Sequence, residues 1–149
     1  MGAGTTRISA LRAGADEAVS VHDQEPTARL FWLTLRGVDR IQSSRAGCGP
    51  RIVSGTAPIW ADGSCDPDPE VQAQRCLEII FSALADAGAT RGDVIRTRIF
   101  IADRADVDAV TRAHGQAFSD VRPAASMIVV SGFLDARWRV EIEAEAVVG

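Results

Sequence analysis

The chain contains no lysine, so all 16 of its basic residues are arginine, and these are spread along the sequence rather than gathered in one window. Acidic residues number 20, which gives a net charge of −4. Binding to nucleic acid draws its affinity from a concentrated basic surface that neutralises phosphates. We therefore expect no nucleic-acid partner.

Long apolar runs are also lacking. The longest, such as residues 124–130, fall far short of the roughly 20 residues that a helix needs to cross a bilayer. The N-terminus has no positively charged start followed by an apolar core, so we expect no secretory signal. We expect a cytoplasmic protein with no membrane partner.

Residues that bind metals are few. The three cysteines, Cys48, Cys65 and Cys76, are spaced as in no zinc or disulfide pattern, and the two histidines, His22 and His114, lie far apart in the chain. We expect free thiols in a reducing compartment and no metal site.

What the chain does contain is typical of one globular domain, with 46% apolar and 24% charged residues in a total of 149. Residues 1–38 show weak periodicity and are predicted to be an N-terminal extension that is loosely ordered or packed on the surface. Within it, the run from Leu30 to Leu35 is prone to form a strand or to dock on one. Residues 39–149 are predicted to form the domain.

Helix and strand signals alternate along that domain. Asp68-Pro69-Glu70 is a strong helix start, and the apolar period that follows ends at Gly88. A second helix is predicted to begin at Asp103 and to end before Pro123. Strands are predicted over residues 42–46, 51–56, 94–102, 122–130 and 139–148, with residues 47–50 as a turn.

The predicted order is therefore β-β-α-β-α-β-β. It indicates an α+β domain of two layers, with the helices on one face of a mixed sheet. Because the other face of such a sheet is left bare, we predict a homo-oligomer of two-fold or three-fold symmetry.

The last strand alternates strictly. Val140, Ile142, Ala144 and Ala146 share one face, while Glu141, Glu143 and Glu145 share the other. The three carboxylates either face water or meet another subunit, where Glu141 could be enclosed in a cleft and used for proton transfer. Periodicity does not decide between these interpretations.

Three further residues or motifs each allow two interpretations. Ser54-Gly55 at a strand end either lets backbone and hydroxyl approach a ligand or forms a plain bulge. His114, on the apolar face of the second helix, is either a core or interface histidine or a base. Cys76 lies on the apolar stripe of the first helix and is interpreted as a core residue rather than a nucleophile.

Taken together, the motifs resemble those of the RidA/YjgF family of reactive intermediate deaminases. The resemblance covers residues 44–148 and rests on five motifs in order: Ile52-Val53-Ser54-Gly55, Gln72 with Gln74, Ala87-Gly88-Ala89 leading to residues 93–98, Arg122-Pro123-Ala124, and Val140-Glu141-Ile142-Glu143-Ala144.

The resemblance implies a chorismate-mutase-like fold that assembles as a homotrimer, with small-molecule pockets between neighbouring subunits. Active members hydrolyse enamines and imines such as 2-aminoacrylate to 2-keto acids and ammonia, without metal or cofactor. A glutamate in the last strand positions water and moves protons, and an arginine after Pro-Ala clamps the substrate carboxylate. Carried over, the glutamate is Glu141 and the Ser-Gly motif is Ser54 and Gly55.

The sequence departs from that pattern where the clamp should be, because Ala125 occupies the arginine position, and the family's pocket tyrosine is absent from a chain without tyrosine. An alanine cannot form the two parallel bonds of a guanidinium on a carboxylate. Ala125, together with the Arg112-Ala113-His114-Gly115 run, is similar to a divergent Rid-like subgroup.

Two arginines are possible replacements for the clamp. Arg139 precedes Glu141 by two residues, and Arg122 stands at the start of the Pro-Ala turn. Each is either a substrate ligand or one half of a surface or intersubunit ion pair. The predicted substrate-binding set is Ser54, Gly55, His114, Arg122, Ala125, Met127 and Arg139, with Glu141 as the catalytic residue.

Three functional hypotheses follow. The first is a Rid-like enzyme that hydrolyses or tautomerises an imine or enamine metabolite, with Glu141 as general acid and base. The second is a trimeric ligand-binding or regulatory homologue that lost deaminase activity when alanine replaced the arginine. The third is a partner-binding module that docks through the run from Leu30 to Leu35.

Overall fold

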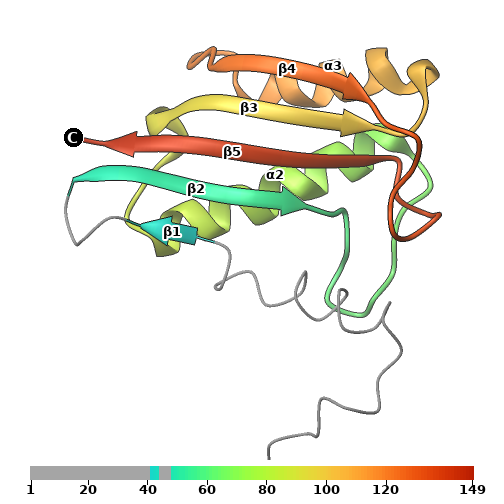
Figure 1. Ribbon diagram of the computed structural model, residues 1–149, viewed down its shortest axis with the longest axis horizontal. Coiled ribbons are helices and arrows are strands. Elements are labelled where there is room, and N and C mark those ends of the chain that lie inside the picture. Colours follow the sequence, from blue (N-terminus) through green and yellow to red (C-terminus); the bar gives the residue numbers. More distant parts are fainter. Residues whose placement is uncertain (1–40, 44–47) are drawn as a thin grey trace, which may run out of the picture.

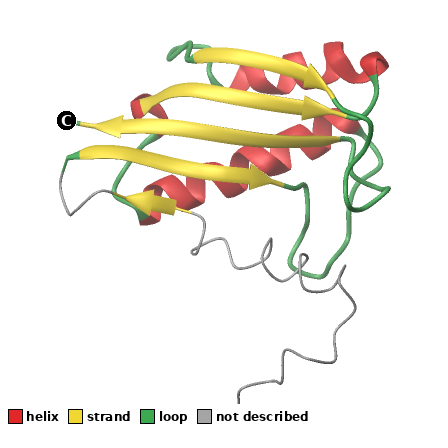
Figure 2. Ribbon diagram, in the orientation of Figure 1, coloured by secondary structure: helices red, strands yellow, loops and turns green. Residues whose placement is uncertain are grey.

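The computed structural model describes residues 41–43 and 48–149, which fold into a five-stranded sheet with two α-helices on one of its faces (Figures 1 and 2). The order of elements is β-β-α-β-α-β-β, so the predicted α+β class and the two-layer arrangement are confirmed. The predicted extension of residues 1–38, including the run from Leu30 to Leu35, lies outside the described residues.

The elements have the following bounds: β1 Ile41–Ser43, β2 Gly49–Thr56, α2 Pro69–Asp86, β3 Val94–Ile101, α3 Val107–Ala117, β4 Ala124–Val129 and β5 Val140–Val148. Two single turns of 3₁₀-helix, Arg91–Asp93 and Arg104–Asp106, precede β3 and α3. None of the helices in the described part of the chain is both long and apolar enough to cross a membrane.

The sheet is mixed, with the order β1-β2-β5-β3-β4. β3 and β4 are parallel because the chain crosses over through α3 between them, and the other neighbouring pairs are antiparallel. β5 lies between β2 and β3, so the strand that carries the three glutamates is central (Figure 1).

The first helix forms as predicted. The carboxylate of Asp68 accepts a hydrogen bond from the backbone N–H of Glu70 at 2.7 Å, and Pro69 occupies the first turn. The helix ends at Asp86, and Gly88 follows with φ +74°, a conformation that glycine adopts without strain.

Two predicted boundaries were wrong. Asp103 caps the 3₁₀ turn rather than an α-helix, so α3 begins only at Val107. Residues 47–50 were predicted to be a turn, but β2 already starts at Gly49, which pairs with Val148 of β5. Pro50 lies one residue outside the part of β2 that pairs with β1, residues 51–53, so β1 needs no hydrogen bond from its nitrogen.

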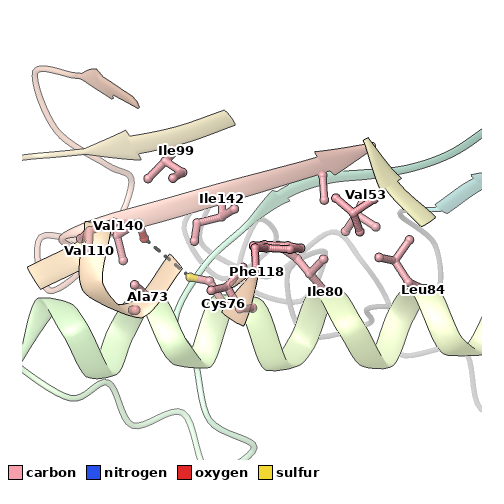
Figure 3. Close-up of a cluster of buried hydrophobic side chains, with 14 of the residues drawn as sticks. Val53, Ala73, Cys76, Ile80, Leu84, Ile99, Val110, Phe118, Val140 and Ile142 are labelled. Carbon is pink, nitrogen blue, oxygen red and sulfur yellow. Dashed lines mark hydrogen bonds between the residues drawn. The ribbon is translucent and has the colours of Figure 1, made fainter. Parts of the chain in front are cut away.

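The hydrophobic core lies between the sheet and the two helices (Figure 3). Val140, Ile142, Ala144 and Ala146 of β5 are at most 1% exposed and pack against the apolar stripe of α2. The predicted alternation of β5 is thus confirmed. Its glutamates alternate with these core residues, so they lie on the opposite sheet face, and each is half-buried. Both described α-helices lie on the other face of the sheet (Figure 2).

Candidate functional site

Glu143 and Glu145 form a charged ladder with the neighbouring strand on the uncovered face. The guanidinium of Arg98 lies 3.2 Å from the Glu143 carboxylate and 3.0 Å from that of Glu145, and Arg96 lies 3.8 Å from Glu145. Cross-strand pairs of opposite charge stabilise a sheet locally. These two glutamates therefore have a structural role in the chain.

The environment of Glu141 differs from that of Glu143 and Glu145, because the Glu141 carboxylate lies against the backbone of Gly55. A Cβ atom at position 55 would fall 2.9 Å from Cδ of Glu141 and closer still to Oε1. The pairing of β2 with β5 is irregular between Val53 and Thr56, and the Thr56 hydroxyl donates to the carbonyl of Ser54 at 3.0 Å. The Ser-Gly motif is thus both a bulge and a close approach to the predicted catalytic carboxylate.

Ala125 and Met127 lie on the other side of the sheet. In the parallel register of β3 and β4, Ala125 pairs with Thr97 and Met127 pairs with Ile99, and both partners face the helices. Glu141 instead pairs with Phe100, one residue out of phase. Paired residues share a face, so one copy of the chain does not bring Ala125 and Glu141 into one pocket.

His114 joins α3 to the sheet on the helix side. Its Nε2 lies 2.9 Å from the hydroxyl of Thr97, and its ring packs on Phe118 with 4.8 Å between centroids. Burial lowers the pKa of His114 below its usual value of 6.5, so the ring is neutral at pH 7. Because Thr97 pairs with Ala125, this neutral polar pair borders the position where the resemblance placed an arginine.

The two arginines proposed as substitute clamps differ in their surroundings. Arg139 binds Asp106 through two hydrogen bonds of 2.8 and 2.6 Å, and the Asp106 side chain is only 5% exposed. This agrees with its interpretation as one half of an ion pair. Arg122 is exposed and adopts φ +53° immediately before the Pro-Ala turn.

A cleft of about 510 Å³ opens at the end of the sheet where β5 begins. Arg139 lines it, whereas Ser54, Gly55 and Glu141 do not. Its lining residues are Cys65, Asp66, Pro67, Ala102, Asp103, Ala136, Arg137, Trp138 and Arg139. Within residues 41–43 and 48–149, no three His, Cys, Asp or Glu side chains are grouped so that they could hold a metal ion.

Cys76 is a core residue, as predicted from its position on the apolar stripe. It is fully buried, and burial raises the pKa of its thiol well above the usual value, with the charge of Glu141 adding to the effect. A thiol of this kind stays protonated and is a poor nucleophile. Gln72, which the sequence supplied only as a motif of the family resemblance and without a role, is a fully buried amide one turn before Cys76. The signal for its role was a polar residue on that stripe.

These features define a class. The element order, the mixed sheet with helices on one face and the strand of alternating glutamates are those of a chorismate-mutase-like α+β domain. Within that class the chain belongs to the endoribonuclease L-PSP family, which is the YjgF/RidA family, and it matches the family over residues 49–148.

Several proteins of known sequence or structure are similar to this chain. An uncharacterized protein of Streptomyces coelicolor is 41% identical over 96 residues, which are 64% of this chain and 72% of that protein. A YjgF/YER057c/UK114 family member from Mycobacterium tuberculosis, Rv2704, is 38% identical with a TM-score of 0.62, over 70% of this chain and 82% of that one. E. coli TdcF, solved with bound serine, is 25% identical with a TM-score of 0.63, over 72% and 91% of the two chains.

Proposed function

We propose that the chain is a Rid-like enzyme that hydrolyses or tautomerises an imine or enamine metabolite, with Glu141 as general acid and base and without metal or cofactor. The observation that carries the proposal is the contact of the Glu141 carboxylate with Gly55 on the uncovered sheet face. Because position 55 has no side chain, the Glu141 carboxylate lies directly against the strand backbone at this face, where a small substrate can meet it.

The chemistry requires one group that accepts and returns protons. In hydrolysis, water adds to the C=N carbon while Glu141 takes one of its protons and returns it to the nitrogen, which gives a carbinolamine. Glu141 then carries the proton of the carbinolamine hydroxyl to the amine, so that the C–N bond breaks, ammonia leaves and the C=O bond forms. In tautomerisation, Glu141 moves a proton between carbon and nitrogen. Glu143 and Glu145 are not proposed for this role, because Arg98 and Arg96 hold them in ion pairs.

The active site is proposed to lie between copies of the chain in a homotrimer. Gly55 and Glu141 occupy the uncovered face, whereas Ala125 and Met127 lie on the opposite face of β4. These two halves meet only if β4 of one copy approaches the uncovered face of another. Exposed apolar residues on both faces of β4 support such a contact: Val129, on the face of Ala125, is 52% exposed, and Ile128, on the uncovered face, is 42% exposed.

The substrate is proposed to be larger than a bare amino acid and to be held by something other than an arginine fork. Ala125 provides no donor, and the nearest polar pair in register, Thr97 with His114, is neutral. The serine bound to TdcF, a relative in the same family, supports a small-molecule pocket. RNA is not proposed as a substrate, because the chain has a net charge of −4 and no clustered basic residues.

The deciding experiment measures ammonia and carbonyl release from 2-aminoacrylate and from bulkier imines. We expect turnover of a bulkier imine by the wild type and loss of at least about 100-fold in Glu141→Gln, since general acid–base catalysis contributes 10²- to 10⁴-fold. Glu143→Gln is the matched control and should retain activity. Equal activity in Glu141→Gln and the wild type would refute the proposal.

The absence of a donor at Ala125 favours one alternative, a trimeric ligand-binding or regulatory homologue without catalysis. In that case the wild type turns over no imine, while ligand binding survives Glu141→Gln. Activity that appears only in Ala125→Arg would show that the scaffold remains competent and that this chain has left the deaminase reaction.

A further inference from the structure

Gln72 is a buried polar side chain that makes three hydrogen bonds to the backbone. It lies in the first turns of α2 and is 0% exposed. Its Nε2 donates to the carbonyl of Asp66 at 2.6 Å and to that of Arg137 at 2.9 Å, and its Oε1 accepts from the backbone N–H of Arg139 at 2.8 Å. One side chain thus bonds to two residues of one segment, 65 and 67 residues further along the chain, and to Asp66, which lies 6 residues before it.

The chemistry of these partners requires an amide. Two carbonyl oxygens need donors and one N–H needs an acceptor, so neither a carboxylate nor an ammonium satisfies all three. A buried backbone group left without a partner is costly, which makes the orientation of the Gln72 amide unambiguous.

The segment that Gln72 holds leads directly into Glu141. Arg139 stands two residues before the carboxylate, its N–H is bound by Gln72, and its guanidinium is bound by Asp106 at the start of α3. Its carbonyl accepts from Ala102 N at 3.0 Å. The start of β5 is therefore held by α2, by the 3₁₀ turn that precedes α3 and by Ala102, which follows β3.

We propose that Gln72 is a positioning residue for Glu141: it fixes the register and direction of residues 137–139, and so sets where the Glu141 carboxylate lies against Gly55. The proposal rests on the proposed catalytic role of Glu141. It also explains why a polar side chain occupies a buried stripe whose next members, Ala73 and Cys76, are packed as core residues.

The test compares three variants with the wild type. Gln72→Met keeps the size of the side chain and removes all three bonds. Gln72→Glu keeps the acceptor for Arg139 and loses the donors, but protonation at low pH restores one donor O–H. Gln74→Met is the control, because Gln74 is exposed on the same helix.

We expect kcat for the bulkier imine to fall about 10- to 100-fold in Gln72→Met, the cost of misplacing a catalytic group by about 1 Å, while KM changes less than about 3-fold. Gln72→Glu should approach the wild type as pH falls and its buried carboxyl protonates, relative to the wild-type pH profile measured in parallel. Gln74→Met should match the wild type. Two results would overturn the positioning role of Gln72. One is a rise in KM as large as the fall in kcat, and the other is unchanged kinetics in a folded Gln72→Met variant.

A second readout does not depend on turnover. The amide resonance of Gly55 reports the neighbouring Glu141 carboxylate, and it should shift in Gln72→Met and return toward its wild-type position in Gln72→Glu at low pH. If the wild type turns over no substrate, the proposed function fails and this resonance alone decides the role of Gln72. A Gly55 resonance unmoved in Gln72→Glu across the pH range would refute it.

Discussion

Among single residues, Gly55 has the tightest steric constraint, because the space next to its Cα is filled by the Glu141 carboxylate. We expect Gly55→Ala to displace that carboxylate and to lower activity at least about 10-fold, since catalysis depends on near-ideal placement. The free energy of unfolding should change by less than about 1 kcal/mol, because the end of a glutamate side chain can move aside. Imine turnover and urea denaturation measure the two effects.

Gly115 is the matched control for this change. It lies in α3, and a Cβ there would meet no atom within 4 Å. Gly115→Ala should therefore raise the free energy of unfolding by about 0.5–1 kcal/mol, the helix preference of alanine over glycine, and leave activity unchanged. Full activity in Gly55→Ala would contradict the role of the Gly55 contact.

His114 gives the stability of the domain a pH dependence of known sign. Burial lowers the pKa of His114 below 6.5 in the folded state, so the unfolded chain binds the proton first as pH falls. Its contribution to stability is complete above about pH 7 and is lost as pH falls from about 6.5 through the folded pKa. Urea denaturation at several pH values between 5 and 8 should show this decline.

The control is His114→Gln, which keeps a hydrogen-bonding group near Thr97 and removes the titration. We expect its pH profile to be flatter than that of the wild type between pH 5 and 7, whatever its stability at pH 8. Identical slopes in that window would mean that another group causes the decline.

Among the elements, the starts of α3 and β5 are joined by the ion pair between Asp106, the residue before α3, and Arg139, the residue before β5. Removal of Arg139 leaves a carboxylate that is only 5% exposed without its cation. Because the Arg139 side chain is itself 40% exposed, we expect Arg139→Gln to lower the free energy of unfolding by about 1–3 kcal/mol, less than for a fully buried pair. Urea denaturation of Asp106→Asn, Arg139→Gln and the double variant measures the coupling.

An exposed pair provides the comparison. Arg112 binds Glu70 at 2.8 Å, with side chains 58% and 24% exposed, so Arg112→Gln should cost less than about 1 kcal/mol. A cost for Arg139→Gln no larger than that for Arg112→Gln would show that the Asp106 pair does not secure the start of β5.

Elements with a strong local signal were predictable from sequence. The Asp68 cap and the alternation around Glu141 follow from local chemistry, so α2 and β5 are where they were expected. Long-range pairing was not predictable, because no local pattern shows that Ala125 registers with Thr97 and so faces away from Glu141. The three partners of Gln72 were missed for the same reason.

On the scale of the whole molecule, the uncovered sheet face is the reason to expect association with other copies of the chain. The homotrimer remains a prediction. Light scattering coupled to size-exclusion chromatography should give about 47 kDa, three times the chain mass of 15.8 kDa.

Ile128 pairs with Phe100 on the uncovered face and is 42% exposed. Ile128→Glu should shift the mass toward 15.8 kDa, because it would bury a charge in the interface.

Ala85→Glu is the control for this variant, since Ala85 is exposed on α2 in the other layer. It should keep the trimer mass. A wild-type mass of 15.8 kDa at micromolar concentration would contradict both the trimer and a pocket built from two copies.

β4 has one further consequence for the life of the chain in a cell. It is an outer strand of the described sheet, and its six residues, Ala124-Ala125-Ser126-Met127-Ile128-Val129, include no proline and no charge. Natural proteins usually protect such edges, because an open and apolar strand recruits other strands into aggregates. A protomer of the proposed homotrimer is therefore most at risk of aggregation before β4 contacts another copy, and conditions that delay this contact should increase aggregation.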